Sequence, residues 1–136
     1  MVNAAEAYKR QQIMTATPEA LTLMLYNGCL KFITEGMEYV EKKDYEQANI
    51  TLQKAQNIIS EFRVTLKMEY DIAKQLMPLY NYTYDRLVEG NMKSDLKQLQ
   101  EAYTIIRELR DAWVLAMKKA RQEQGTKNVQ GNSYVG

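Results

Sequence analysis

The chain has 136 residues, with 18 Lys and Arg against 17 Asp and Glu, so its formal net charge is only +1. That length fits one domain, and the small net charge argues against sequence-independent binding to nucleic acid. The sequence contains no histidine and a single cysteine, Cys29. These counts exclude histidine acid–base catalysis, histidine-containing metal sites and an intramolecular disulfide, and no cofactor is expected.

Neither a membrane span nor a secretion signal is expected. No stretch approaches the roughly 18 uninterrupted apolar residues that indicate a membrane-spanning helix. The start of the chain, Met1 to Tyr8, lacks the basic residues and the apolar run of a signal peptide. We therefore expect a cytoplasmic protein that does not insert directly into a membrane.

The first half of the chain predicts two long helices, because Gly and Pro, with 6 and 2 copies in the whole sequence, interrupt it rarely. One helix spans about residues 17–43. Thr17 can cap it through its hydroxyl, and Pro18 fits the first helical position. The next begins with a cap at Asp44 and continues to about residue 66 or 68.

The second half of the chain predicts two more helices. One spans about residues 71–89 and ends at Gly90, a residue suited to a left-handed helix terminus. It contains Pro78, which removes a backbone donor, so we expect a kink there or a regular part that begins later than residue 71. The other helix opens at residue 94 or 95 and continues to about residue 124.

Four long helices joined by short loops predict an all-α fold, an antiparallel up-down four-helix bundle. Residues 17–124 would form this bundle. Residues 1–16 would form an N-terminal cap segment with a short helix over residues 3–14. Residues 125–136 contain three glycines and would form a flexible C-terminal tail.

Projection at about 100° per residue gives each of the last three helices one core stripe. The stripes are Tyr45, Ala48, Leu52, Ala55, Ile59, Phe62 and Leu66, then Ile72, Leu76, Leu79, Tyr80, Tyr84 and Leu87, then Leu99, Ala102, Ile106, Leu109, Trp113 and Met117. Five apolar residues lie off these stripes: Ile50, Val64, Tyr82, Val114 and Leu115.

The first long helix carries more apolar surface than one core face requires. Its two stripes are Leu21, Leu25, Cys29 and Phe32, and Leu23, Tyr26, Leu30, Ile33, Met37 and Val40. A bundle helix usually has one apolar face a little over 100° wide. Either this helix has neighbours on both sides, or part of one stripe binds something outside the bundle.

No arrangement of residues points to catalysis. Glu35, Glu38 and Glu41 have the spacing of a solvated helix face, and Cys29 lies in an apolar stripe, where a core role is expected. A ferritin-type metal bundle needs Glu-x-x-His motifs, which a chain without histidine cannot supply. We therefore expect a non-enzyme: either a bundle that binds a partner, or a structural bundle whose surplus stripes meet in copies of itself.

Four stretches resemble, in order and spacing, the FliS family of flagellar secretion chaperones. The longest is residues 15–28, TATPEALTLMLYNG, which follows the family pattern T-A-[ST]-P-x-x-L-x-x-M-L-Y-[DN]-G and continues as CLKF. The others are KAQNII at 54–59, LYNYTYDRLVEGN at 79–91 and LRDAW at 109–113. The resemblance covers about residues 5–120, and Pro78, Gly90 and the tail depart from it.

The resemblance implies a cytoplasmic chaperone that binds the C-terminal segment of flagellin and prevents its premature polymerisation. It also implies delivery of flagellin to the flagellar type III secretion apparatus through a component of the export gate. The client would lie in apolar grooves, and a short N-terminal segment would cover one groove in the free protein.

These expectations select candidate residues for each role. Because the client needs apolar surface outside the core, the candidates for binding flagellin are Tyr82, Ile50, Val64, Val114, Leu115, Leu23 and Tyr26. For the N-terminal lid, the candidates are the apolar residues Tyr8, Ile13 and Met14. The oligomeric state is left open.

Overall fold

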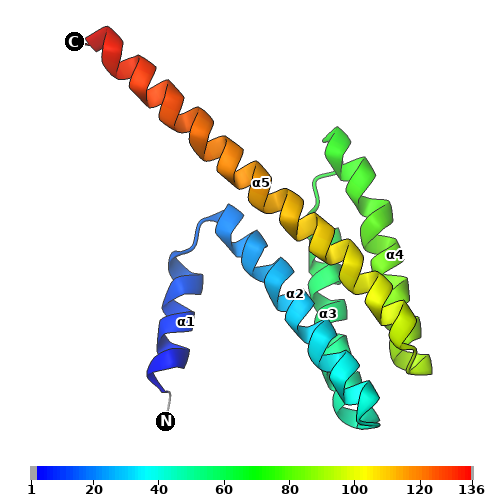
Figure 1. Ribbon diagram of the computed structural model, residues 1–136. Helices are drawn as coiled ribbons and strands as arrows, with labels where there is room; N and C mark the ends of the chain where they lie inside the picture. Colours follow the sequence, from blue (N-terminus) through cyan, green and yellow to red (C-terminus); the bar gives the residue numbers. More distant parts are fainter. Residues whose placement is uncertain (1–2, 136) are drawn as a thin grey trace.

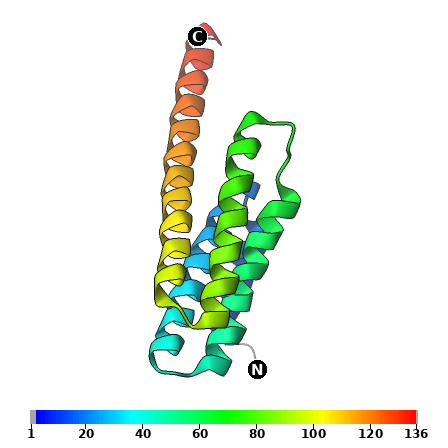
Figure 2. The ribbon, with the colours of Figure 1, turned by 90° about the vertical axis from the view of Figure 1, so that its right-hand side faces the viewer.

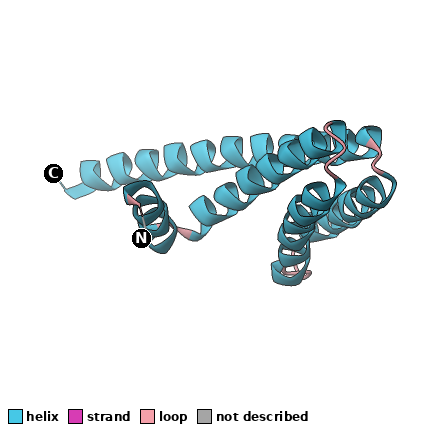
Figure 3. Cartoon of the chain, turned by 90° about the horizontal axis from the view of Figure 1, so that it is seen from below, coloured by secondary structure: helices cyan, strands magenta, loops and turns pink. Residues whose placement is uncertain are grey.

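The computed structural model describes residues 3–135, and the side chains of residues 3–125. Residues 3–135 contain no strand, so the predicted all-α class is confirmed. The helices are α1 (Ala4–Thr15), α2 (Pro18–Glu41), α3 (Tyr45–Thr65), α4 (Asp71–Lys93) and α5 (Leu96–Val135). Short loops connect them (Figure 3).

Two of the predicted helix starts carry the expected caps, and the start of α5 carries a further one. The Thr17 hydroxyl accepts a hydrogen bond from the Ala20 N–H at 3.2 Å, and Pro18 opens α2. The Asp44 carboxylate accepts from the Gln47 N–H at 3.2 Å at the start of α3. At the start of α5, Asp95 accepts from the Lys97 N–H at 3.0 Å. Each side chain satisfies a backbone donor that the first turn leaves without an intrahelical partner.

Helices α2 to α5 form a four-helix bundle in which α2 and α4 each pack against both α3 and α5. Successive helices run in opposite directions, so the predicted antiparallel up-down bundle is confirmed (Figures 1 and 2). Helix α2 therefore has a neighbour on each side. This arrangement accounts for both of its apolar stripes without a partner outside the bundle.

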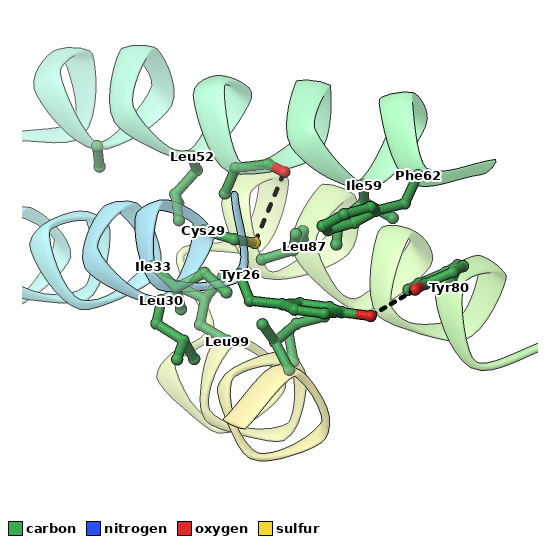
Figure 4. Packing of buried hydrophobic residues seen from close by; sticks show 14 of the residues in the cluster. Tyr26, Cys29, Leu30, Ile33, Leu52, Ile59, Phe62, Tyr80, Leu87 and Leu99 are labelled. Atoms are coloured by element: carbon green, nitrogen blue, oxygen red, sulfur yellow. Dashed lines mark hydrogen bonds between the residues drawn. The ribbon is translucent and has the colours of Figure 1, made fainter. Parts of the chain in front are cut away.

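The core draws large side chains from all four bundle helices (Figure 4). The fully buried aliphatic residues are Ile33, Leu52, Ile59, Leu87, Leu99 and Ile106. Cys29 is also fully buried, and its thiol lies 3.9 Å from the Ala55 carbonyl oxygen. Burial raises the pKa of the Cys29 thiol to about 12, so this cysteine is an inert core residue, as predicted.

Three residues assigned to the core stripes are exposed instead: Tyr45, Ile72 and Leu79. Tyr45 is the first residue of α3, and Ile72 lies in the first turn of α4, where the neighbouring helices no longer surround the side chain. On α4 the buried face is formed by Tyr80, Thr83, Leu87 and Gly90, and Leu79 lies beside that face.

Two predicted helix ends are wrong. Helix α4 continues past Gly90 and ends at Lys93, and the C-cap residue Ser94 adopts the left-handed conformation with φ 52°. Helix α5 continues to Val135, so the backbone of residues 125–135 is helical and not an irregular tail. Pro78 lies inside α4, which begins at Asp71, so of the two alternatives at this proline the later start is wrong and the kink stays a prediction.

Helix α1 stands apart from the bundle (Figures 1 and 3). None of its residues is buried, and Tyr8, Ile13 and Met14 are all exposed. The predicted packing of this segment over a groove is therefore absent from this conformation of residues 4–15. Within the described part of the chain, no helix is both long enough and apolar enough to cross a membrane.

Candidate binding groove

An apolar groove of about 580 Å³ opens at the end of the bundle that carries the α3–α4 loop. All four bundle helices contribute to it, because the first turns of α2 and α4, the last turn of α3 and the middle of α5 meet there. Its large apolar lining residues are Phe62, Leu66, Ile72, Leu76, Leu109 and Trp113. Within the described residues, the chain places no helix of its own over these side chains.

The floor of the groove is an aromatic cluster. The Tyr26 ring lies 4.7 Å from the Phe62 ring, and the Phe62 ring stacks on the Tyr80 ring at 5.4 Å with an interplanar angle of 14°. The Tyr26 and Tyr80 hydroxyls are 2.7 Å apart and hydrogen-bonded (Figure 4). Because three helices supply the three rings, this cluster also ties α2, α3 and α4 together.

One edge of the groove is held by Trp113 of α5. Its indole N–H donates a hydrogen bond to the Glu19 carbonyl oxygen at 3.0 Å, in the first turn of α2. Nearby, Arg110 of α5 donates to the Asn27 side chain at 3.0 Å. These two contacts fix α5 against α2 beside the groove, so its wall is held by hydrogen bonds as well as by apolar packing.

Of the seven residues predicted to bind the client, the structure places Tyr26 in the groove. Ile50, Val64, Tyr82 and Leu115 are exposed, whereas Val114 and Leu23 are half-buried. Their off-core assignment is thus correct for the four exposed residues, but these lie on separate faces of α3, α4 and α5. Tyr82 donates a hydrogen bond to Glu101 at 3.0 Å, and that bond raises the pKa of its phenol.

The large apolar groove residues named above were assigned to the core from the sequence. Phe62 and Leu66 end the stripe of the second predicted helix, and Ile72 and Leu76 begin the stripe of the third. In an up-down bundle, the end of one helix lies beside the start of the next. The available signal was therefore a set of core stripes that all continue to the same end of the bundle.

The described residues contain no group of three or more acidic, cysteine or histidine side chains that could hold a metal ion. The groove offers aromatic and aliphatic surface with a few hydroxyl groups. Such a surface binds an apolar or amphipathic polypeptide segment. Fold and groove together define a four-helix bundle with an open apolar groove at one end.

Comparisons with known proteins agree on one family. The family described as "Flagellar protein FliS" matches residues 1–120. The flagellar secretion chaperone FliS of Bacillus subtilis is 42% identical over 122 residues, covering 90% of this chain and 92% of that protein. FliS of Escherichia coli is 29% identical, covering 74% of this chain and 76% of that protein.

The chain belongs to the FliS family, whose relatives named here are flagellar secretion chaperones. A solved structure, a flagellar chaperone from bacteria, superimposes with a TM-score of 0.70 and covers 86% of this chain and 99% of its own. Its sequence is 19% identical, so this likeness shows the shared fold alone.

Proposed function

We propose that the chain is a cytosolic export chaperone without catalytic activity. It binds the C-terminal segment of flagellin, prevents premature polymerisation and delivers the client to the type III export apparatus through an export gate component. The observation that carries this proposal is the apolar groove over the Tyr26–Phe62–Tyr80 cluster, in a chain whose family consists of flagellar secretion chaperones.

The groove offers the apolar surface that a disordered client segment needs. A disordered segment loses conformational entropy when it binds, so its partner must supply enough apolar area to offset that cost. The groove supplies leucine, isoleucine and aromatic side chains in one place. Rigid helices around it keep that surface in position before binding, which reduces the ordering cost on the chaperone side.

The test uses Trp113, which lines the groove and is the one tryptophan in the sequence. Titration with a peptide of the flagellin C-terminal segment is expected to shift its fluorescence emission, and calorimetry gives the affinity. Ile72→Asp should weaken binding at least tenfold, since Ile72 is 59% exposed and lines the groove.

The matched control is Met92→Asp, on the same helix and 79% exposed at the opposite end of α4. It should bind as the unmodified chain does. A peptide that binds neither the unmodified chain nor its variants would contradict the proposed function. Concentration-dependent light scattering that does not respond to peptide would favour a self-associating structural bundle.

The off-core residues Ile50, Val64, Tyr82, Val114 and Leu115, with Leu23, remain candidates for the rest of the client path. A client that wraps the bundle would cross several faces, and their exposed side chains lie on α3, α4 and α5. Tyr82→Asp should then weaken binding with little loss of stability, because Tyr82 is exposed and its hydroxyl bonds only Glu101 among the described residues.

Helix α1 is proposed as a lid for the groove. Its apolar residues Tyr8, Ile13 and Met14 are exposed, and the extended residues Ala16 and Thr17 separate it from α2. A two-residue extended link permits the helix to change direction relative to the bundle. The lid would cover groove side chains in the absence of client and leave when client binds.

A further inference from the structure

The Tyr26 and Tyr80 hydroxyls form a buried polar pair within the floor of a mostly apolar groove. The two oxygens are 2.7 Å apart, and the residues are 4% and 3% exposed. Both residues line the groove, and Figure 4 shows the two side chains pointing toward each other from α2 and α4. The Phe62 ring packs on both tyrosine rings, so the position of each hydroxyl is fixed.

The pair has two hydroxyl protons, but only one hydrogen bond joins the two hydroxyls. Each tyrosine hydroxyl carries one proton, and one of the two protons is used in the bond between them. Neither hydroxyl has another hydrogen-bond partner among residues 3–125, so the second proton is left without an acceptor. Burial raises the pKa of both phenols, so both remain protonated at physiological pH.

We infer that the Tyr26–Tyr80 pair is the specificity-determining hydrogen-bond donor of the groove. The client segment places one acceptor oxygen, from a side chain or a free backbone carbonyl, over the pair and buries apolar residues on either side. This inference rests on the proposed function and adds to it the chemistry of the segment that is recognised.

The pair selects the register in which the client segment lies in the groove, as well as the composition of that segment. An apolar segment seated over the hydroxyls would bury a donor without a partner, which opposes binding. Sliding a matching segment by one residue would move its acceptor away and place an apolar side chain there. The groove therefore favours one register of an amphipathic segment over many registers of a uniformly apolar one.

The test compares Tyr26→Phe, Tyr80→Phe and the double variant in calorimetric titrations with a flagellin C-terminal peptide. Each single variant keeps one hydroxyl, whose proton is then free to be donated, so its affinity should fall less than about threefold. The double variant keeps the rings and the apolar surface of the groove but removes both hydroxyl donors of its floor. Its affinity should fall at least about tenfold, the effect of leaving a buried partner without its hydrogen bond.

Tyr84→Phe is the matched control, because Tyr84 is half-buried on α4 and lies outside the groove lining. It should bind peptide as the unmodified chain does. Melting curves are recorded for all variants, and titrations are made well below each melting temperature. This separates loss of a donor from loss of the folded bundle.

The outcomes distinguish this inference from the proposed function. If the double variant binds the peptide as tightly as the unmodified chain does, or more tightly, the hydroxyl pair is a purely structural contact and the inference is wrong. The proposed function would stand in that case. If the unmodified chain itself does not bind the peptide, the proposed function and the inference both fail.

Discussion

Gly36 and Gly90 occupy equivalent places near the ends of α2 and α4, each facing a leucine of the following helix. A Cβ at Gly36 would lie 2.6 Å from Leu52 Cγ, and one at Gly90 would lie 2.8 Å from Leu99 Cγ. Real Cβ atoms do not approach other atoms this closely. Both leucines are fully buried, so they have little freedom to move aside.

Gly36→Ala is therefore expected to destabilise the bundle. Overpacking costs about 1–3 kcal/mol, and the better helix propensity of alanine offsets about 1 kcal/mol of that. Gly28→Ala on the same helix is the control, since its Cβ would meet only Ile58 Cδ1 at 3.8 Å. Urea unfolding should give opposite signs for the two variants; a gain in stability for Gly36→Ala would contradict the packing argument.

Ile59→Ala tests whether the core stripe of α3 is assigned correctly. Ile59 is fully buried on α3, so its truncation should cost about 2–5 kcal/mol of unfolding free energy through the cavity left behind. Val64→Ala provides the comparison on the same helix, because Val64 is exposed. Its stability should change by no more than about 0.5 kcal/mol. Equal losses in denaturant unfolding would mean that the two faces of α3 are wrongly assigned.

The sequence predicts the buried face of a helix correctly where the helix has neighbours on that face. Leu52, Ile59 and Leu99 are buried as the stripes require, whereas Tyr45 and Ile72 are exposed at helix ends. A projection at 100° per residue gives the direction of a side chain but not the point at which the neighbouring helix ends. That point depends on how the helices are staggered in the fold.

At the scale of the elements, Asp95 controls the short turn between α4 and α5. Its carboxylate accepts from the Lys97 backbone N–H and from the Gln98 side chain, both at 3.0 Å. The hydrogen bond from Gln98 and those from the backbone lower the pKa of Asp95 below the ordinary value of 3.8. The ionised form is therefore favoured in the folded state.

A lowered pKa in the folded state fixes the sign of the pH dependence. The stabilisation is present above the ordinary aspartate pKa and is lost as the pH falls through the lower folded-state value. Asp95→Asn keeps a capping oxygen without the charge. We expect its melting temperature to fall less steeply with acid than that of the unmodified chain. If the melting temperatures of the variant and of the unmodified chain fall equally from neutral to acid pH, the Asp95 charge has no such role.

Helix starts were more predictable than helix ends. Thr17 and Asp44 cap α2 and α3 as expected, because a cap is a local hydrogen bond that needs only a side chain and the next turn. Gly90 suggested an end by its identity, yet it is buried within α4 against Leu99. The sequence alone does not distinguish a glycine needed for its backbone freedom from one needed for its small size.

At the scale of the whole molecule, the groove was not predicted because it belongs to no single helix. Its lining extends along the sequence from Thr22 to Ala116, and the large aliphatic residues in it resemble ordinary core residues of their own helices. The groove exists because the bundle ends unevenly, with α5 continuing beyond its neighbours (Figure 1). Tyr26 of α2 was the one binding candidate found there.

Helix α1 is expected to be dispensable for the stability of the bundle. It contributes no buried residue, so deletion of residues 1–14 should leave the melting temperature of the bundle within about 2 °C. The Thr17 cap of α2 is retained. If α1 acts as a lid, the deletion should also tighten binding of a flagellin C-terminal peptide, because a competing occupant of the groove has been removed.

Replacing Tyr8, Ile13 and Met14 together by serine in the full chain is the control for this deletion. Those side chains supply the apolar surface of the lid, so the triple variant should bind as tightly as the deletion does, although its helix is still attached. Unchanged affinity in both would mean that the segment does not cover the groove. A loss of more than tenfold with an unchanged melting temperature would make α1 a direct contact of the client, because removing a lid can only expose the Tyr26–Phe62–Tyr80 floor.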